Sequence, residues 1–412
     1  MPITRREALL SATMLAAAGL PVMANAFPEA KKSRSGPPES AALPQTAANL
    51  NPQLSCLSDF EAAAKGRVPH MAWEFFNGAA ADEITMRWNL EAYQRIKLKP
   101  HVLVDVSKID TRVHLLGQEL AFPIILAPTA YHKLAHPEGE LATARGAGAA
   151  HATMVVSTVA TTSIEDIAKV ATQPLWFQLY VQRDRGFTRE LVQRAEAAGV
   201  RALCLTVDTP ITGARNRELR AQFELPPELD RPNLRGLKVG GVAVATDPSA
   251  HLATGESIYT SATDPSMTWK DLDWLLSFAK VPLLTKGILN PEDADRAVKA
   301  GVAGIMVSNH GARNLDTVPA TIEALPLVAE KVAGRVPVIV DGGVRRGTDV
   351  LKAIANGANA AMIGRPYLYG LSVAGDAGVA RVVDILRREF EMAMALTGRP
   401  TIASIDRTVF WT

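Results

Sequence analysis

The sequence predicts an α/β fold: a (β/α)8 TIM barrel with a helical N-terminal extension and a long loop after its fourth strand. Eight short apolar runs follow one another from residue 123 to residue 366, and such runs are typical of strands buried on both faces. Segments with helical periodicity, such as Thr188–Ala198 and Glu292–Ala300, separate several runs, as in a barrel. The alternative is a doubly wound open sheet, which is weakened because no G-x-G-x-x-G motif follows any run.

The first 26 residues have the pattern of an export signal. Arg5 and Arg6 precede a short, weakly apolar stretch that ends in the A-x-A sequence Ala24-Asn25-Ala26, an order typical of cleaved signal peptides. The paired arginines resemble a twin-arginine signal, which implies a periplasmic or otherwise exported protein. An amphipathic helix and an uncleaved anchor are the alternatives, but the apolar part is shorter than the roughly 20 residues of a membrane span.

Two further segments precede the barrel strands. Residues 27–54 are rich in Pro, Ala, Ser, Asn and Gln, which predicts a flexible linker. The barrel domain is predicted over residues 55–412. Its first part, residues 60–99, is expected to pack against the barrel through the aromatic residues Trp73, Phe75, Phe76 and Trp88.

The eight apolar runs each contain seven or eight residues. They are Pro123–Ala130, Thr153–Ala160, Pro174–Val181, Ala202–Thr209, Pro282–Ile288, Gly304–His310, Pro337–Gly343 and Ala360–Pro366. The long separation between the fourth and fifth runs indicates an inserted loop over about residues 210–280, which is rich in proline. Long loops in compact domains often act as lids. We therefore expect this loop to cover the C-terminal end of the barrel, where barrel active sites lie.

Composition argues against several classes of protein. Lys and Arg number 44 against 42 Asp and Glu, and the formal net charge of +2 is not gathered into a basic run, which argues against nucleic-acid binding. The two cysteines, Cys56 and Cys204, cannot form a disulfide framework or a four-cysteine zinc site. His132 and His136 have the spacing of zinc ligands on a helix, but the glutamate of H-E-x-x-H is missing. No metal site is therefore predicted.

Polar side chains occur near the ends of the later runs, where barrel chemistry takes place. They include Gln178, Tyr180, Thr206, Asp208, Lys286, Ser308, His310 and Asp341. His310 with Asp208 suits a base and its orienting carboxylate, and Arg313 suits an anion fork. Lys286 allows three interpretations: a Schiff-base lysine, a cation beside an electron-rich ring, or a surface lysine.

The last two loops predict a phosphate site. Gly342, Gly343 and Arg345 follow the seventh run, and Gly364 and Arg365 end the eighth. Loops at these places in a barrel often bind phosphate through backbone N–H groups, a helix N-terminus and arginines. Because the sequence lacks a Walker P-loop and a dinucleotide fingerprint, a mononucleotide fits better. The alternative is that the two glycines form a simple turn.

Four sequence blocks carry a family resemblance: SNHGARNL (308–315), DGGVRRGTD (341–349), TVDTP (206–210) and AHPEG (135–139). With these blocks the sequence resembles the FMN-dependent L-2-hydroxy-acid oxidase and dehydrogenase family, over about residues 57–407. Glycolate oxidase, lactate oxidase and mandelate dehydrogenase belong to it. The resemblance implies an FMN barrel enzyme that oxidises a small, lactate-like 2-hydroxy acid and passes electrons to a quinone, a cytochrome or oxygen. It also implies a homo-oligomer, a tetramer in many members.

The resemblance implies a role for each matching residue. His310 would be the catalytic base, paired with Asp208, and Tyr180 would hydrogen-bond the substrate oxygen. Arg313 would bind the substrate carboxylate, with Arg215 nearby. The flavin ring would be lined by Ala127, Pro128, Thr129, Ala130, Ser157, Gln178, Thr206 and Ser308, with Lys286 at its N1/O2 edge, and the ribityl and phosphate groups would be held by Asp341, Gly343, Arg345, Gly364 and Arg365.

One residue departs from the family pattern. Phe75 stands where the family usually has a tyrosine whose hydroxyl touches the substrate carboxylate, so a hydrogen bond worth about 0.5–1.5 kcal/mol is missing. Two other functions compete with hydroxy-acid oxidation: an FMN barrel of another reaction class, such as an isomerase, and an exported binding protein that has lost its flavin. The His310 and Arg313 pair argues against the first, and Lys286 with both phosphate loops argues against the second.

Overall fold

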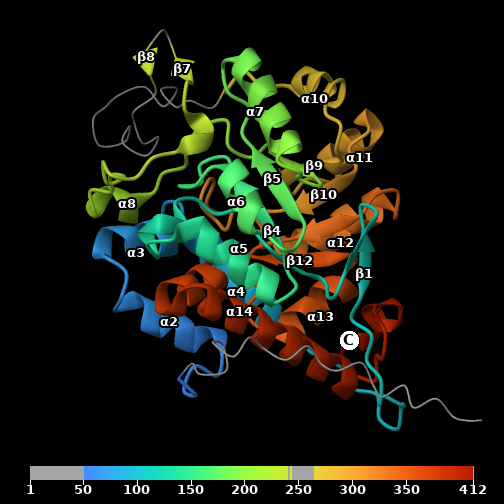
Figure 1. Ribbon diagram of the computed structural model, residues 1–412. Coiled ribbons are helices and arrows are strands. Elements are labelled where there is room, and N and C mark those ends of the chain that lie inside the picture. Colours follow the sequence, from blue (N-terminus) through green and yellow to red (C-terminus); the bar gives the residue numbers. More distant parts are fainter. Residues whose placement is uncertain (1–50, 240–241, 244–263, 412) are drawn as a thin grey trace, which may run out of the picture. The chain divides into compact units, whose positions relative to one another are not determined.

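The computed structural model describes residues 51–239, 242–243 and 264–411; the predicted export signal and most of the predicted linker lie outside these residues. Eight parallel strands close into a barrel (Figure 1). In barrel order they are β3 (Ile124–Leu126), β4 (Thr153–Ser157), β5 (Leu175–Leu179), β6 (Leu203–Thr206), β9 (Leu283–Ile288), β10 (Gly304–Val307), β11 (Val338–Val340) and β12 (Ala360–Ile363). Each strand lies inside one predicted apolar run. The predicted barrel is therefore confirmed, and the open-sheet alternative is wrong.

Each barrel strand is followed along the chain by a helix of the outer layer. These helices are α5 (Gly139–Ala149), α6 (Ile164–Val170), α7 (Arg185–Ala197), α10 (Trp269–Leu276), α11 (Pro291–Ala300), α12 (Thr321–Val332), α13 (Gly347–Ala355) and α14 (Arg365–Leu396). Helix α10 lies within residues 210–280, so the prediction of a loop was wrong for this part. The Asp271 carboxylate accepts the backbone N–H of Thr268 at 2.7 Å, and Leu272 and Leu275 are buried, so a capped start and an apolar face form a barrel helix here.

The interior of the barrel is apolar at its N-terminal end. Inward-facing side chains from the strands, including Trp176, Cys204 and Met306, form one buried cluster. A hairpin of β1 (Val113–Leu115) and β2 (Gln118–Leu120) contributes to the same cluster and closes this end. The burial of Cys204 confirms its prediction as a core residue. Because side chains alternate along a strand, the next inward positions lie at the opposite, C-terminal end of the barrel.

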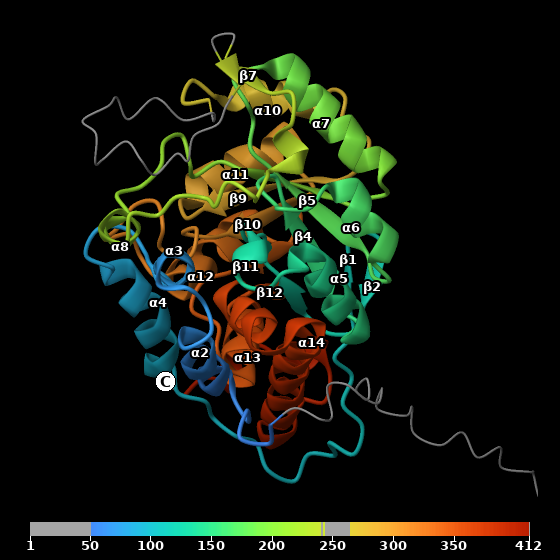
Figure 2. The ribbon, with the colours of Figure 1, turned by 60° about the vertical axis from the view of Figure 1, so that its left-hand side comes forward.

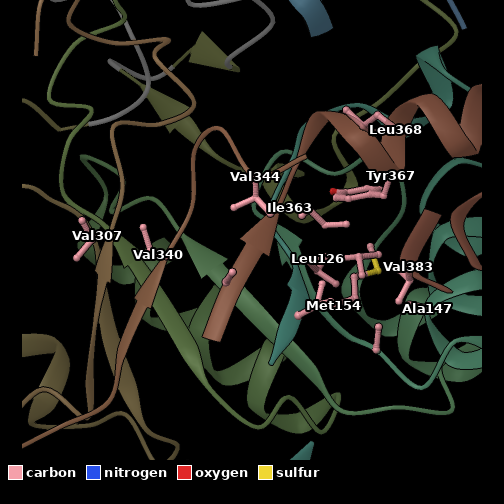
Figure 3. Packing of buried hydrophobic residues seen from close by; sticks show 14 of the residues in the cluster. Leu126, Ala147, Met154, Val307, Val340, Val344, Ile363, Tyr367, Leu368 and Val383 are labelled. Carbon is pink, nitrogen blue, oxygen red and sulfur yellow. The ribbon is translucent and has the colours of Figure 1, made fainter. Parts of the chain in front are cut away.

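A second apolar layer lies between the strands and the helices. Figure 3 shows part of it, where Leu126, Met154 and Ile363 of neighbouring strands face Ala147 of α5 and Val383 of α14. All five side chains are at most 2% exposed. Strands covered on both faces in this way explain why the runs read as continuous apolar sequence.

The N-terminal extension forms three helices, α2 (Leu57–Lys65), α3 (His70–Asn77) and α4 (Ile84–Arg95). In both ribbon views α2 lies beside α14, and α4 contacts α12 (Figures 1 and 2). The insertion after β6 contains the short helix α8 (Asn216–Arg220), which contacts α3, and the strand pair β7 (Lys238–Val239) and β8 (Val242–Ala243). Within the described residues no helix is both long and apolar enough to span a membrane.

Candidate active site

A cavity lies at the C-terminal end of the barrel and contains most of the predicted site. Of the residues predicted to act or bind, its lining includes Phe75, Ala127, Pro128, Thr129, Ala130, Ser157, Gln178, Tyr180, Thr206, Arg215, Lys286, His310, Arg313, Asp341, Gly343, Arg345, Gly364 and Arg365. The two remaining residues, Asp208 and Ser308, are hydrogen-bonded to lining residues from behind. The fold thus brings every predicted site residue to one place.

Two hydrogen-bonded groups of side chains form the floor of the cavity. Gln178 accepts a hydrogen bond from the Ser157 hydroxyl at 3.1 Å and donates one to Thr206 at 2.9 Å. Across the barrel, Lys286 Nζ donates to Ser308 Oγ at 3.1 Å, and that hydroxyl donates to Asp341 Oδ2 at 2.8 Å. Lys286 lies inside β9 rather than at its end, so the predicted position at a strand end was two residues off.

Lys286 stays charged although it is only 4% exposed. Burial alone would lower its pKa, but the negative charges of Asp341 and Asp208 outweigh burial and raise the pKa above its usual value. Ser308 is the only hydrogen-bond partner of Nζ among the described residues. Two N–H donors of a buried cation therefore remain available to a ligand in the cavity.

His310 and Asp208 form a pair beside the cavity. Nδ1 of His310 lies 2.9 Å from Oδ1 of Asp208, so Nδ1 carries the donated hydrogen and Nε2 keeps its lone pair. Nε2 lies 3.3 Å from the Tyr180 hydroxyl. Burial lowers the pKa of His310 below its usual value, against the opposing charge of Asp208. A neutral imidazole with an unprotonated nitrogen, here Nε2 accepting from Tyr180, is what a general base requires.

Arg313 is held beside the pre-barrel helix α3. Its Nη1 donates to the carbonyl oxygens of Phe75 at 2.6 Å and Gly78 at 2.9 Å, and its guanidinium carbon lies 4.9 Å from the centre of the Phe75 ring. Phe75 also stacks on Phe223, with ring centres 4.4 Å apart. The residue that lacks the family hydroxyl therefore still contacts the predicted carboxylate-binding arginine, through its ring and its backbone.

A buried carboxylate that sequence reasoning missed joins the two predicted substrate arginines. Glu218 of α8 is 1% exposed, and its Oε1 accepts from Arg313 Nη2 at 2.7 Å. Its Oε2 lies 3.5 Å from Arg215 Nη1. Glu218 lies in a charged stretch of the insertion, and nothing in that pattern distinguishes a buried acid from a surface one.

The phosphate end of the cavity carries two arginines that form no ion pair with the carboxylates of the described chain. Arg365 donates to the carbonyl oxygens of Phe76, Gly311 and Gly78 at 2.9, 3.1 and 2.7 Å. Nη1 of Arg345 donates to the carbonyl oxygen of Val344 at 3.0 Å. Their full positive charge is therefore available to an anion.

The backbone at this end differs from the prediction in one respect. Asp349 accepts the N–H groups of Arg345 and Arg346 at 2.9 Å each, so these two N–H groups, which directly precede α13, are already occupied. Gly343 has a φ of +85°, and a Cβ at this position would meet the backbone oxygen of Asn89 at 2.1 Å. Only glycine suits this conformation.

The donor set fits flavin mononucleotide. Two uncompensated guanidiniums suit its phosphate, and Asp341 Oδ1, which is buried without a hydrogen-bond partner among the described residues, suits a ribityl hydroxyl. The polar floor and Lys286 suit the nitrogen- and oxygen-bearing edge of the ring. By contrast, both ring nitrogens of His132 are hydrogen-bonded, to Thr129 at 2.7 Å and Thr143 at 3.0 Å. That histidine thus takes part in the support of the loop after β3.

Comparisons with known proteins agree with this donor set. A family model described as FMN-dependent dehydrogenase matches residues 64–412. The chain is 47% identical over 356 residues to the peroxisomal (S)-2-hydroxyacid oxidase GLO4 of Arabidopsis thaliana, with 86% of this chain and 96% of the relative covered. It is 46% identical over 358 residues to an L-lactate oxidase of Nostoc sp., with 85% and 96% covered.

Solved structures give the same result. A structure of mandelate oxidase with benzoyl-formic acid is 36% identical, has a TM-score of 0.77, and covers 86% of this chain and 97% of its own. A mutant of an active chimera of (S)-mandelate dehydrogenase is 35% identical, has a TM-score of 0.80, and covers 87% and 99%.

Proposed function

We propose, since this chain belongs to the FMN-dependent dehydrogenase family, that it oxidises a small, lactate-like L-2-hydroxy acid to the 2-oxo acid. As a member it is an FMN-dependent enzyme of the (S)-2-hydroxy-acid oxidase and dehydrogenase type. The proposal is supported by one observation: the His310 imidazole, whose Nδ1 is hydrogen-bonded to Asp208, and the Arg313 guanidinium line the same cavity, where they would serve as base and carboxylate-binding group.

The cofactor completes this site. FMN supplies the acceptor for the two electrons that leave the substrate. Arg345 and Arg365 would hold its phosphate, Asp341 its ribityl hydroxyls, and Lys286 would place a positive charge beside its ring. A fixed cation in a buried site stabilises negative charge without any rearrangement during the reaction.

The substrate is bound and oriented by protein groups. Arg313 has five N–H donors, of which three are engaged with Phe75, Gly78 and Glu218. Nε–H and one Nη2–H remain, and two neighbouring N–H groups are suited to a bidentate carboxylate. Tyr180, next to His310 Nε2, would donate its hydroxyl to the substrate oxygen.

His310 takes up a proton that the substrate releases on oxidation. The proton arrives at Nε2, while Nδ1–H stays hydrogen-bonded to Asp208. The resulting imidazolium is stabilised by the Asp208 carboxylate, whose pKa is held below its usual value by His310 and Lys286 although burial opposes this shift. Positioned proton transfer of this kind contributes roughly 10²–10⁴-fold to a rate.

Export is part of the proposal. The signal pattern of residues 1–26 supports an exported enzyme, for which a quinone or cytochrome acceptor would be accessible. The names of the two relatives above, both oxidases, support oxygen as the acceptor. The two acceptors are separated by the experiment below.

The test is an anaerobic visible spectrum of the purified protein, titrated with glycolate, L-lactate, L-mandelate and longer L-2-hydroxy acids. We expect a flavin band that at least one of these acids bleaches. Rapid return of colour in air would identify an oxidase, and slow return in air with rapid return on addition of a quinone would identify a dehydrogenase. His310→Ala should keep the flavin band and lose the bleaching. A yellow protein that no hydroxy acid bleaches would overturn the proposed function.

A further inference from the structure

Glu218 contacts both arginines of the substrate side and no other charged group among the described residues. Its carboxylate forms ion pairs with Arg313 at 2.7 Å and Arg215 at 3.5 Å. We propose that Glu218 is a positioning residue that fixes both guanidiniums and sets the charge of the carboxylate site to that of a substrate with a single carboxylate. The inference rests on the proposed function, because it assigns Arg313 to the substrate.

The fold brings Glu218 to this place through a close backbone contact. A Cβ at Gly213 would lie 2.6 Å from the carbonyl oxygen of Arg313 and 2.2 Å from that of Asn314, so only glycine allows the insertion to approach the loop after β10. Arg215 Nε then donates to the Arg313 carbonyl oxygen at 3.3 Å. Arg217, on the same helix as Glu218, is ion-paired with Glu74 of α3. Glu218 is thus held on a fixed element.

The contacts of Glu218 determine which arginine donors face the cavity. Of the two Nη2 hydrogens of Arg313, one is engaged with Glu218, and both Nη1 hydrogens have carbonyl partners. A guanidinium restrained at both terminal nitrogens can present its remaining donors in only one direction. Without Glu218, Nη2 would lose this restraint, and only the carbonyl contacts of Nη1 would hold the guanidinium in place.

The charges of the site balance for one substrate carboxylate. Two guanidiniums and Glu218 together carry a net charge of one positive unit, which a single carboxylate neutralises. An uncompensated charge in a buried site is costly. Burial and the charges of Arg215 and Arg365 lower the pKa of Arg313 to about 9, and Glu218 acts in the opposite direction. Glu218 thus offsets part of the cost of burying the Arg313 guanidinium beside other positive charges.

The charge assignment is tested with two anions that are not oxidised, oxalate and 2-hydroxyisobutyrate, which carry two carboxylates and one. Their dissociation constants are measured from the change in flavin absorption, without turnover. In Glu218→Gln the site carries two positive charges, which favours the anion with two carboxylates. We therefore expect the ratio of the affinity for oxalate to the affinity for 2-hydroxyisobutyrate to be at least about tenfold higher than in the parent protein. An unchanged preference would overturn the assignment. Glu228→Gln, an exposed residue of the same insertion, is the control and should keep the parental preference.

The positioning role is tested by turnover with whichever hydroxy acid bleaches the parent protein. We expect kcat of Glu218→Gln to fall at least about tenfold while its flavin content stays parental; a parental kcat would overturn the role. If the glutamine variant fails to fold, Glu218→Asp provides the test of the positioning role, because it keeps the carboxylate charge but shortens the side chain by one methylene group. It should keep the parental anion preference and lose kcat, and a parental kcat would count against the proposal. Since the anion titrations need no turnover, failure of the proposed function would be recognised separately, in the parent protein.

Discussion

Nδ1 of His310 lies 2.9 Å from Oδ1 of Asp208, although the two residues follow different strands, β10 and β6. The pair forms because these strands both neighbour β9 in the barrel, and their C-terminal ends therefore lie close together. His310 has a φ of +58°, a strained backbone conformation that directs its ring toward Asp208 and the cavity.

This pair predicts a specific pH profile. The base must be neutral, and burial lowers the pKa of His310 below 6.5. Activity should therefore rise with pH through a value below 6.5 and be level near neutrality. In Asp208→Asn the charge that raises the His310 pKa is lost, so the acidic limb should move to lower pH and the rate should fall by about 10²–10⁴-fold. The rate of anaerobic flavin bleaching, measured as a function of pH, reports both effects. Asp230→Asn, a change at an exposed residue, is the control and should keep the parental profile. A limb that moves to higher pH would contradict the assignment.

Phe75→Tyr should strengthen substrate binding. The added hydroxyl would restore the hydrogen bond to the substrate carboxylate that the family resemblance implies, worth about 0.5–1.5 kcal/mol, or roughly 2- to 12-fold in KM. Steady-state kinetics with the preferred hydroxy acid checks this value. Phe76→Tyr serves as the neighbouring control, since Phe76 is not at the matching position. A higher KM in Phe75→Tyr would mean that this site binds a different head group.

Arg345→Met should weaken the binding of FMN but not the binding of riboflavin, which lacks the phosphate. Because the Arg345 guanidinium has no carboxylate partner in the described chain, its loss removes a charge-assisted contact to phosphate, worth about 1.5–3 kcal/mol. Binding of FMN to the apoprotein should weaken by roughly 10- to 150-fold, while riboflavin binding stays the same. Flavin fluorescence quenching measures both. Equal weakening of the two ligands would place Arg345 away from the phosphate.

Lys286→Gln should make the bound flavin harder to reduce. The buried ammonium lies in the floor of the cavity, where its charge would stabilise negative charge on a reduced ring. We expect the two-electron potential to fall by about 30 mV or more, equivalent to roughly 1.4 kcal/mol. Potentiometric titration with a reference dye measures it. A potential unchanged within error would exclude Lys286 from the neighbourhood of the ring.

Trp176→Ala should destabilise the barrel. Trp176 is 0% exposed in the interior cluster, and truncation of such a side chain costs about 3–5 kcal/mol. Urea unfolding followed by circular dichroism measures the loss in free energy of unfolding. Trp411→Ala is the matched control, because Trp411 is 64% exposed and surface changes usually stay within about 0.5 kcal/mol. A loss equal to that of the control would contradict the packing of the barrel interior.

The barrel and the positions of its site residues could be predicted because both depend on local sequence. Strands buried on both faces leave continuous apolar runs, and the polar residues that interrupt those runs, such as Gln178 and Thr206, form the polar floor. Helix α10 was missed because it lies at the end of a long segment that was interpreted as one loop on account of its prolines, although residues 266–280 contain neither proline nor glycine. Its capping contact from Thr268 to Asp271 is the signal that could have revealed it.

Glu218 could not be predicted, because its burial depends on contacts distant in sequence. The loop after β10 encloses Glu218 on one side, because Gly213 of the insertion allows the two segments to approach closely. Helix α3 encloses it on another side, where the ion pair between Glu74 and Arg217 joins α3 to α8. The sequence around Glu218 does not indicate these distant contacts. The cap before α13, by contrast, is local: Asp349 accepts the N–H groups of Arg345 and Arg346, and its position three residues after Arg346 is the signal that could have revealed it.

The end of helix α3 has an electrostatic consequence for the whole site. The consecutive carbonyl oxygens from Phe75 to Gly78 all accept hydrogen bonds from arginines. A helix dipole places about half a negative elementary charge at its C-terminus, so Arg313 and Arg365 are stabilised by a partial charge that cannot be titrated or exchanged for a salt ion. The N-terminal extension thus lets two largely buried cations persist beside the cavity, although Glu218 is the one carboxylate paired with either of them among the described residues.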